Sequence, residues 1–237
     1  MPPVPPPLTL PIREVLPATP RSRIVRVDLR RRVFDYLAGQ AVLIASHQYE
    51  KRRPYSIACA PEDARDSDCL ELLIGVDASG SPGPHLTLEA GALIDIEGPV
   101  GRFVFPAAPV EQRFLFVAGG TGIAPLRAMM RHAVRLPGRS ISLLYSARAP
   151  GDFAYEDEMQ GLMRAGRISL RQTVTRDLSA EGWTGTRGRI GSTDLAALVH
   201  DPETLCFVCG PQALVQDIPR LLEIAGVLKS RIRIEEW

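Results

Sequence analysis

The sequence of 237 residues is poor in cysteine and in aromatic residues, and it carries almost no excess charge of either sign. Its 28 Lys and Arg against 27 Asp and Glu leave a formal net charge of +1, which gives no electrostatic reason to expect a nucleic-acid partner. No uninterrupted apolar run approaches the roughly 20 residues that a membrane-spanning helix needs. We therefore expect neither nucleic-acid binding nor a membrane span.

The four cysteines, Cys59, Cys69, Cys206 and Cys209, do not have the spacing of a disulfide framework. Cys206 and Cys209 form a C-x-x-C pair, but residues 205–208 have the composition of a buried strand. Positions three apart in a strand point to opposite faces, and no second pair of this kind is present to complete a zinc site. The sequence therefore disfavours a metal or a disulfide at this pair.

The amino-terminal run 1–8, MPPVPPPL, lacks the charged and then apolar plan of a secretion signal. It predicts a polyproline arm or a frayed end. The length suggests one large or two small domains, and 45% hydrophobic residues are enough for a sizeable core. We expect a cytoplasmic protein.

Residues 9–105 have a β-rich pattern of short strands separated by Pro, Gly and Asp clusters. This pattern predicts a closed antiparallel barrel. The strands expected are residues 24–29, 40–45, 55–58, 70–76 and 93–96, and a short helix is expected over residues 86–89.

After a linker at residues 106–112, strands alternate with helices, which predicts a parallel sheet covered by helices. The fold class expected is therefore β followed by α/β: an antiparallel barrel domain over residues 1–106 and a parallel-sheet domain over residues 112–237. The strands expected in the second domain are residues 114–118, 140–145, 168–174, 205–208 and 231–235, and the helices are residues 124–135, 155–164, 192–199 and 213–225.

The first strand of the second domain breaks at Gly119-Gly120-Thr121-Gly122, and a helix with Pro125 in its first turn follows. Glycines let the backbone approach a phosphate closely, and free N–H groups at a helix start point towards it. On the glycines alone, a tight turn without a ligand remains an alternative. Cys209-Gly210-Pro211 also follows a strand directly, so both loops are expected to line one crevice.

The most informative run of the first domain is Arg53-Pro54-Tyr55-Ser56. An Arg fork can hold a phosphate, Tyr offers an aromatic wall, and a Ser hydroxyl can donate to a ring nitrogen. These groups suit a flat cofactor with a phosphate tail. Taken alone, the run also fits an ordinary amphipathic strand.

Together these runs resemble the ferredoxin–NADP reductase superfamily of two-domain flavoprotein reductases, over residues 10–237. The resemblance rests on the order of several motifs. They are Arg53-Pro54-Tyr55-Ser56, Gly98-Pro99-Val100-Gly101-Arg102-Phe103, Gly119 to Pro125, Leu144-Tyr145-Ser146-Ala147-Arg148, Val208-Cys209-Gly210-Pro211 and Glu235-Glu236-Trp237.

The resemblance implies a flavin in the barrel domain, FAD with FMN as the alternative. Arg53 would pair with the flavin phosphate, Tyr55 would pack on the isoalloxazine, and Ser56 would lie near N5, where hydride arrives. The family's second phosphate motif has Gly followed by Ser or Thr. Here it corresponds to Gly80 and Gly83, with Gly83 in place of the hydroxyl residue, so backbone N–H groups are expected to replace it.

The resemblance also implies a nicotinamide nucleotide in the second domain. Gly120, Thr121, Gly122 and Pro125 would hold the pyrophosphate, and Cys209, Gly210 and Pro211 would lie beside the nicotinamide. Ser56, Cys209 and Glu235 would surround the hydride path, while Trp237 would cover the flavin and move aside for nicotinamide. Ser146, Arg148 and Arg176 favour NADPH over NADH, although Asp152 and Asp177 keep NADH open.

We therefore expect a reductase that takes hydride from NADPH or NADH. The cysteines cannot supply a plant-type [2Fe–2S] centre, so the acceptor would be separate: a ferredoxin, an oxygenase component or a small oxidant. Basic residues at 30–32 and 51–53 would attract an acidic carrier, or are simply solvated. The alternative is a non-catalytic subunit that senses nucleotide or flavin. A plain dehydrogenase fits poorly, because its glycine motif would not follow a barrel.

Overall fold

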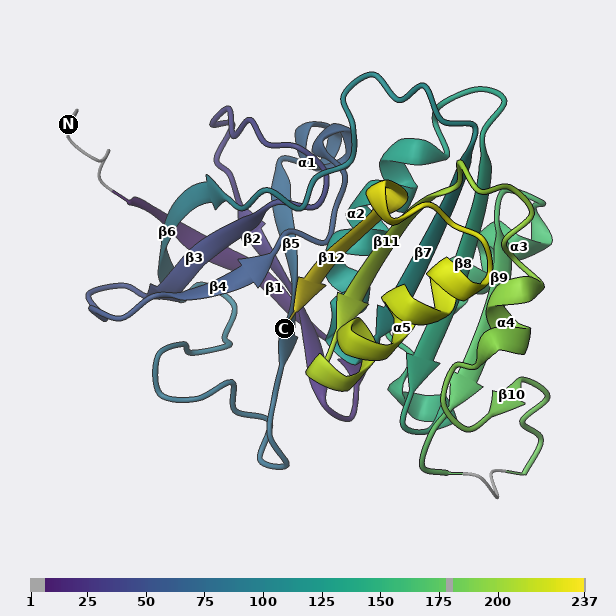
Figure 1. The fold of residues 1–237 in the computed structure, drawn as a ribbon. Helices are drawn as coiled ribbons and strands as arrows, with labels where there is room; N and C mark the ends of the chain where they lie inside the picture. The colour runs from purple at the N-terminus through teal and green to yellow at the C-terminus, as the bar shows by residue number, and fades with distance from the viewer. Residues whose placement is uncertain (1–6, 178–180, 237) are drawn as a thin grey trace.

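Two six-stranded sheets, the first antiparallel and the second parallel, follow each other along the chain in the computed structural model (Figure 1). The structure describes residues 7–177 and 181–236, so Trp237 and most of the predicted polyproline arm lie outside the described residues. The expected class, β followed by α/β, is confirmed. No helix in residues 7–177 or 181–236 is long and apolar enough to cross a membrane.

The first sheet has the strand order β4-β3-β6-β1-β2-β5, and every pairing in it is antiparallel. The expected closed barrel is corrected, because the edge strands β4 and β5 are joined by one isolated bridge, between Ile57 and Leu72, and not by a continuous ladder. The sheet curls into a barrel shape around an apolar core that includes Val25, Ile44 and Ile94. Its strands are β1 (Leu8–Thr19), β2 (Ser22–Asp28), β3 (Ala41–Ser46), β4 (Arg53–Ser56), β5 (Cys69–Gly75) and β6 (Leu93–Val100).

Three elements of the first half differ from the sequence expectation. The helix expected over residues 86–89 is wrong: these residues form an irregular loop, with Leu86 buried in the barrel core. Helix α1 (Pro61–Ser67) was not expected, since only Pro61 and Ala64 of its seven residues are buried and no apolar period marks it. Strand β1 was not expected either, because Pro11 and Pro17 interrupt its pattern.

The second sheet is parallel throughout, with the order β10-β9-β8-β7-β11-β12. The first of its strands, β7, therefore lies in the middle, between β8 and β11. From β7 the chain adds strands first on one side of the sheet and then on the other, so the strand order reverses at β7. Open sheets of this kind bind ligands beyond the carboxyl ends of the strands at the reversal. The strands are β7 (Arg113–Gly119), β8 (Ser140–Ala147), β9 (Ser169–Val174), β10 (Thr186–Arg187), β11 (Leu205–Gly210) and β12 (Ile232–Glu236).

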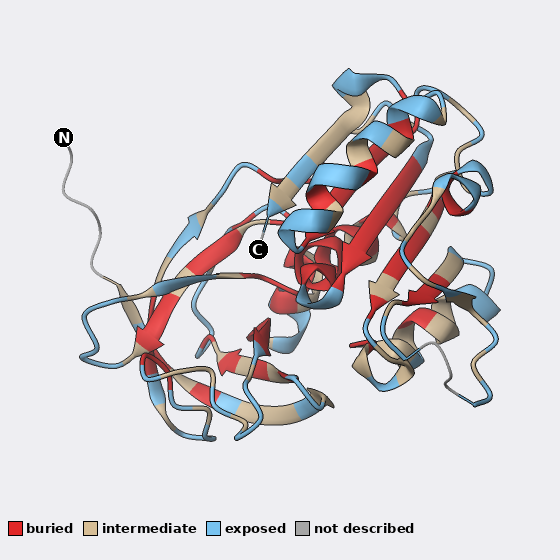
Figure 2. Ribbon diagram, turned by 60° about the horizontal axis from the view of Figure 1, so that its bottom comes forward, coloured by how far each residue is buried: buried red, intermediate tan, exposed pale blue. Residues whose placement is uncertain are grey.

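Helices cover both faces of the parallel sheet, and alternate residues of each central strand face opposite cores. Phe207 and Cys209 belong to the core beneath α2 and α3, whereas Cys206 and Val208 belong to the core beneath α4 and α5. The two cysteines of the C-x-x-C pair thus face opposite sides, as predicted. Figure 2 shows buried central strands and exposed outer faces on the covering helices. The helices are α2 (Ile123–Ala133), α3 (Glu156–Arg164), α4 (Ser192–Ala196) and α5 (Gln212–Ile224).

The two halves meet along a boundary, called the seam below, where α1 and the barrel sheet pack against α2. The apolar core around α2 extends across it and includes Ala58, Leu73 and Phe105 from the first half. Phe105 contacts both Phe114 and Phe207, with ring centroids 4.8 and 5.8 Å apart. This shared core holds the first sheet against the second.

Candidate functional site

The glycine loop predicted as an anion site connects β7 to α2 through a short 3-10 turn at Gly120–Gly122. Gly122 has ordinary helical dihedrals, yet a Cβ there would lie 2.4 Å from the carbonyl oxygen of Cys209. Gly120 has φ of +55°, a conformation that glycine adopts without strain. The loop therefore lies directly on the end of β11, and α2 begins there with its first N–H groups at the loop.

A cavity of about 630 Å³ opens at the carboxyl ends of the parallel strands, next to this loop. It brings together four segments that were identified separately in the sequence, at the ends of β7, β8, β9 and β11. The backbone N–H of Arg176 donates to the carbonyl of Arg148 at 2.9 Å, which holds the loop after β9 beside the loop after β8. The predicted residues that line the cavity are Gly120, Thr121, Gly122, Ser146, Arg148, Arg176, Gly210 and Pro211.

One wall of the cavity comes from the barrel half, and its residues were not expected at the site from their local sequence. Thr19, Arg21, Ser22 and Val76 line it, from the β1–β2 turn and the end of β5. Arg21 reaches across to Asp152 of the second half, with Nε 3.8 Å from Oδ1. The cavity is therefore built by both halves of the chain.

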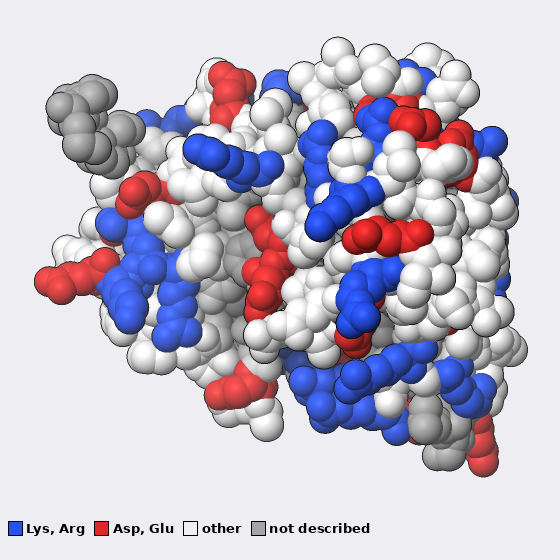
Figure 3. All heavy atoms as spheres, viewed as in Figure 1, with Lys and Arg blue, Asp and Glu red and all other residues white. Residues whose placement is uncertain are grey.

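Cationic side chains outnumber anionic ones around the cavity. Arg189 also lines it and forms an exposed pair with Asp217, 3.9 Å apart. Figure 3 shows Lys and Arg side chains gathered along the lower edge of the parallel-sheet half, where the arrows of Figure 1 end. A site with this excess of guanidinium groups beside the amino-terminal end of a helix attracts phosphate. The charged lining consists of Arg21, Arg148, Arg176 and Arg189 with Asp152 and Asp217.

The second candidate run forms β4, the edge strand of the barrel sheet. Arg53 and Pro54 are exposed, Tyr55 is half-buried, and Ser56 is buried with 6% of its surface exposed. The Oγ of Ser56 has no hydrogen-bond partner in the described structure. A buried hydroxyl without a protein partner is costly unless a ligand or water completes it, so this strand fits a cofactor with a polar ring edge.

Tyr55 has a partner that the sequence did not suggest, His85. The Tyr55 hydroxyl lies 2.8 Å from His85 Nε2, and the two rings are nearly parallel with centroids 6.0 Å apart. Burial lowers the pKa of His85, and the nearby Arg53 lowers it further. His85 is 1% exposed and its Nδ1 has no partner among the described residues, so the neutral ring is a second incomplete polar group near β4.

The glycines of the expected phosphate motif lie in the loop before His85, and both have positive φ, +83° at Gly80 and +106° at Gly83. Their amides are already engaged within the loop. The N–H of Gly83 donates to Ser81 Oγ at 3.1 Å, and that of Gly80 donates to the carbonyl of Asp77 at 3.0 Å. The amides of Gly80 and Gly83 therefore give no support to the expectation that backbone N–H groups replace the missing hydroxyl.

The structure places Cys209 and Glu235 side by side, as register partners on the neighbouring strands β11 and β12. Cys209 is fully buried, whereas Glu235 is partly exposed. The carboxyl-terminal end of β12 lies at the side of the parallel sheet that faces the barrel half in both views (Figures 1 and 2). Pro125 is the third residue of α2 and is buried behind the loop instead of lining the cavity. The described residues contain no cluster of His, Cys, Asp or Glu that could hold a metal.

Comparison with known proteins gives relatives of this architecture. Residues 116–220 match the family described as the oxidoreductase NAD-binding domain. The ferredoxin–NADP reductase B of Sorangium cellulosum is 31% identical over 228 residues, which cover 88% of this chain and 91% of that protein.

Two solved structures have the same fold at lower identity. The flavohem-like FAD/NAD binding domain of nitric oxide dioxygenase from Vibrio cholerae is 20% identical, with a TM-score of 0.81 over 98% of this chain and 99% of that one. The ferredoxin reductase in carbazole 1,9a-dioxygenase is 24% identical, with a TM-score of 0.82 over 97% of this chain and 68% of that one.

Proposed function

This chain belongs to the ferredoxin–NADP reductase superfamily of NAD(P)H-dependent flavoprotein reductases, and from that membership we propose that it takes hydride from NADPH onto FAD and passes the electrons to a separate acceptor protein. The observation that carries the proposal is the single cavity lined by loops after β7, β8, β9 and β11. Eight residues selected by sequence for nucleotide binding meet there.

The nucleotide is held by the loop after β7 and by the arginines that surround it. The dipole of α2 and the glycine backbone that precedes this helix favour a pyrophosphate beside Gly120, Thr121 and Gly122. Gly210 and Pro211 bound the opposite side of the same cavity. The nicotinamide end would then extend towards Cys209 and the seam.

Preference for NADPH follows from the side chains after β8 and β9. Ser146 lies in the cavity, and Arg148 and Arg176 are exposed there on loops joined by a backbone hydrogen bond. A guanidinium pair with a hydroxyl suits the 2′-phosphate that distinguishes NADPH from NADH. Asp152 is the acid that could favour NADH by binding the ribose hydroxyls of the nucleotide. It already pairs with Arg21, which weakens the case for NADH.

The barrel half would hold the flavin, which supplies a hydride acceptor when bound. On β4, Arg53 is exposed and able to pair with phosphate, while Tyr55 presents an aromatic face whose hydroxyl is fixed by His85. The unpartnered Oγ of Ser56 is available to donate to the ring edge that gains electrons. Cys209 and Glu235, adjacent in register, would lie beside the nicotinamide when it is bound.

The acceptor is proposed to be a ferredoxin or an oxygenase component, since relatives of this chain carry such names. Arg30, Arg31 and Arg32 are exposed, as are Lys51 and Arg53, so an acidic carrier would be attracted to the barrel half. If charge attracts the ferredoxin, the rate of electron transfer to it should fall as the salt concentration rises.

The test is made on the purified protein loaded with FAD, with NADPH and NADH added separately in the absence of oxygen. We expect yellow holoprotein whose colour bleaches faster with NADPH, followed by reoxidation when ferredoxin is added. Retained FAD without bleaching by either nucleotide would refute the reductase. Protein that takes up no flavin would support the nucleotide-sensing subunit instead.

A further inference from the structure

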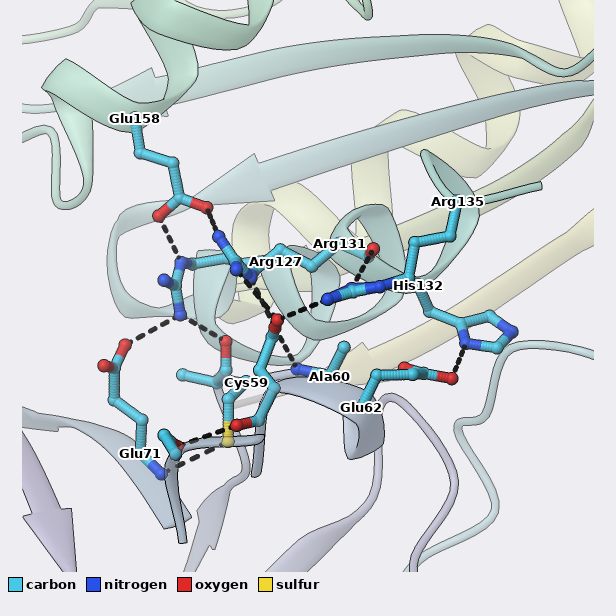
Figure 4. Close-up of polar contacts among 12 residues, drawn as sticks. Cys59, Ala60, Glu62, Glu71, Arg127, Arg131, His132, Arg135 and Glu158 are labelled. Carbon is cyan, nitrogen blue, oxygen red and sulfur yellow. Dashed lines mark hydrogen bonds and ion pairs between the residues drawn. The ribbon is translucent and has the colours of Figure 1, made fainter. Parts of the chain in front are cut away.

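The seam contains a buried arginine that links α2, the helix after the glycine loop, to the chain just beyond the end of β4. Arg127 lies on α2 and is 7% exposed. Its Nη1 donates to the carbonyl oxygen of Ala58 and to Glu71 Oε1, and its Nε donates to Glu158 Oε2, each at 2.7 Å (Figure 4). The ring of Tyr155 lies 4.0 Å from the guanidinium carbon. All of these groups hold the guanidinium in one orientation.

The hydrogen bond between Arg127 and Ala58 connects the two candidate sites, because each of these residues is only a few positions away from one of them. Ala58 is two residues after Ser56, and its N–H donates to the carbonyl of Glu71, so the end of the β4 run is fixed against β5. Arg127 is five residues after Gly122, on the helix that begins at the glycine loop. About 7.5 Å of helix therefore separates the arginine from the loop.

The ion pairs at the seam do not depend on Arg127 alone. Its buried position therefore suggests a role beyond neutralising the two carboxylates. Each of its carboxylate partners has a second arginine: Glu71 Oε2 accepts from Arg26 Nε, and Glu158 Oε1 accepts from Arg131 Nη1, both at 2.7 Å. Arg131 also binds Asp63 on α1. The hydrogen bond that Arg127 alone adds in this cluster is the one with the carbonyl oxygen of Ala58, two residues after the end of β4.

We propose that Arg127 is a positioning residue that sets the approach of the nicotinamide to the flavin, by tying the helix of the pyrophosphate loop to the strand that carries Ser56. The inference rests on the proposed function for its catalytic consequence. Hydride transfer requires its two partners within a narrow range of distance, so a small shift between α2 and β4 slows the step without weakening either binding site.

The test variant is Arg127→Met, which keeps an unbranched side chain as far as the position of Nε and removes the hydrogen-bonding guanidinium. Glu71 and Glu158 keep their second arginines, so the variant leaves neither carboxylate without a cation. The matched control is Arg131→Met, one turn further along α2. It also crosses the seam, but to α1 and not to the β4 run.

Three quantities are measured on each full-length holoprotein: the flavin potential, the dissociation constant of NADP⁺, and the rate of flavin reduction at saturating NADPH. For Arg127→Met we expect the first two to stay near those of the wild type and the reduction rate to fall about 10- to 100-fold. Arg131→Met should keep a rate close to the wild type. A normal rate in Arg127→Met, or equal slowing in both variants, overturns the proposal.

Amide hydrogen exchange on the protein without cofactors gives a second readout, independent of turnover. Arg127→Met should speed exchange in residues 56–60 and 119–126 together, and Arg131→Met should not. If Arg127→Met does not fold, Arg127→Lys carries the same test, since an ammonium lacks the planar fork that reaches Ala58 and both acids. Wild-type rate and exchange in Arg127→Lys overturn the proposal.

The two proposals fail in different ways. If the wild type binds no flavin, or is reduced by neither nucleotide, the reductase function fails while the exchange experiment still tests the coupling of the two segments. If the wild type is reduced and Arg127→Met is reduced as fast, the reductase stands and the positioning role fails.

Discussion

Replacing Gly122 by alanine adds one methyl group at the point where the glycine loop touches β11. The φ of Gly122 is −61°, so alanine adopts the same backbone without strain. The added Cβ would lie 2.4 Å from the carbonyl oxygen of Cys209, 2.6 Å from its carbonyl carbon and 2.7 Å from Gly210 Cα. All three are backbone atoms, so no side chain can rotate away to relieve the contact.

The magnitude follows from the nature of these contacts. Extra atoms forced into a packed site cost about 1–3 kcal/mol, and a clash with three backbone atoms belongs at the upper end of that range. About 3 kcal/mol lowers the melting temperature of a domain of this size by about 6–12 °C. The shift must also separate the loop from Cys209 and Gly210, so we expect nucleotide affinity to fall in the same variant.

The control is Gly161→Ala in α3, where a Cβ meets no atom within 4 Å and φ is not positive. The same chemical change should raise stability there by about 0.5–1 kcal/mol, because glycine disfavours the helix interior. Melting temperature and NADP⁺ affinity, the latter by titration calorimetry, are measured for both. A Gly122→Ala variant as stable as the wild type would refute the steric reasoning.

Three further predictions concern individual side chains. Ser56→Ala should slow flavin reduction about tenfold or more, because it removes one hydrogen bond to a group that gains charge. The free energy of unfolding should change little, because the Oγ of Ser56 has no protein partner. An unchanged reduction rate in stopped-flow experiments would exclude Ser56 from the hydride site. Arg148→Ala should lower the affinity for NADPH about tenfold more than the affinity for NADH, as measured by titration of both nucleotides, and the difference should shrink at high salt. Equal losses of affinity would argue against a 2′-phosphate contact. Burial, with Arg53, lowers the pKa of His85, so its contribution to stability is complete above pH about 6.5 and is lost as the pH falls through the lowered value. His85→Phe should flatten that part of the curve of unfolding free energy against pH, and an unchanged curve would exclude His85 as its source.

Local patterns predicted most of the parallel half. Residues 205–208 are apolar throughout because β11 is covered on both faces, and the glycine loop is recognisable because Gly122 touches the end of that strand. Both signals lie within a few adjacent residues. The loops after β7 and β11 were therefore expected in one crevice, and they line one cavity.

Features that depend on distant partners were not predictable in the same way. The partners of Arg127 lie 31, 56 and 69 positions away along the chain, and an arginine on an amphipathic helix is ordinarily solvent-exposed. The pairing of Tyr55 with His85 spans 30 positions, and no local period marks it. The short helix α1 is polar on most of its surface, so its sequence lacks the apolar repeat of a longer helix.

The wall that Thr19, Arg21, Ser22 and Val76 give to the cavity has a consequence for protein engineering. A hybrid made by fusing the carboxyl-terminal half of one reductase to the amino-terminal half of another exchanges part of the pocket, even when every nucleotide motif is transplanted intact. Coenzyme switching by swapping halves at residues 106–112 should therefore transfer the donor's β1–β2 turn together with the loops of the donor's carboxyl-terminal half, as one unit.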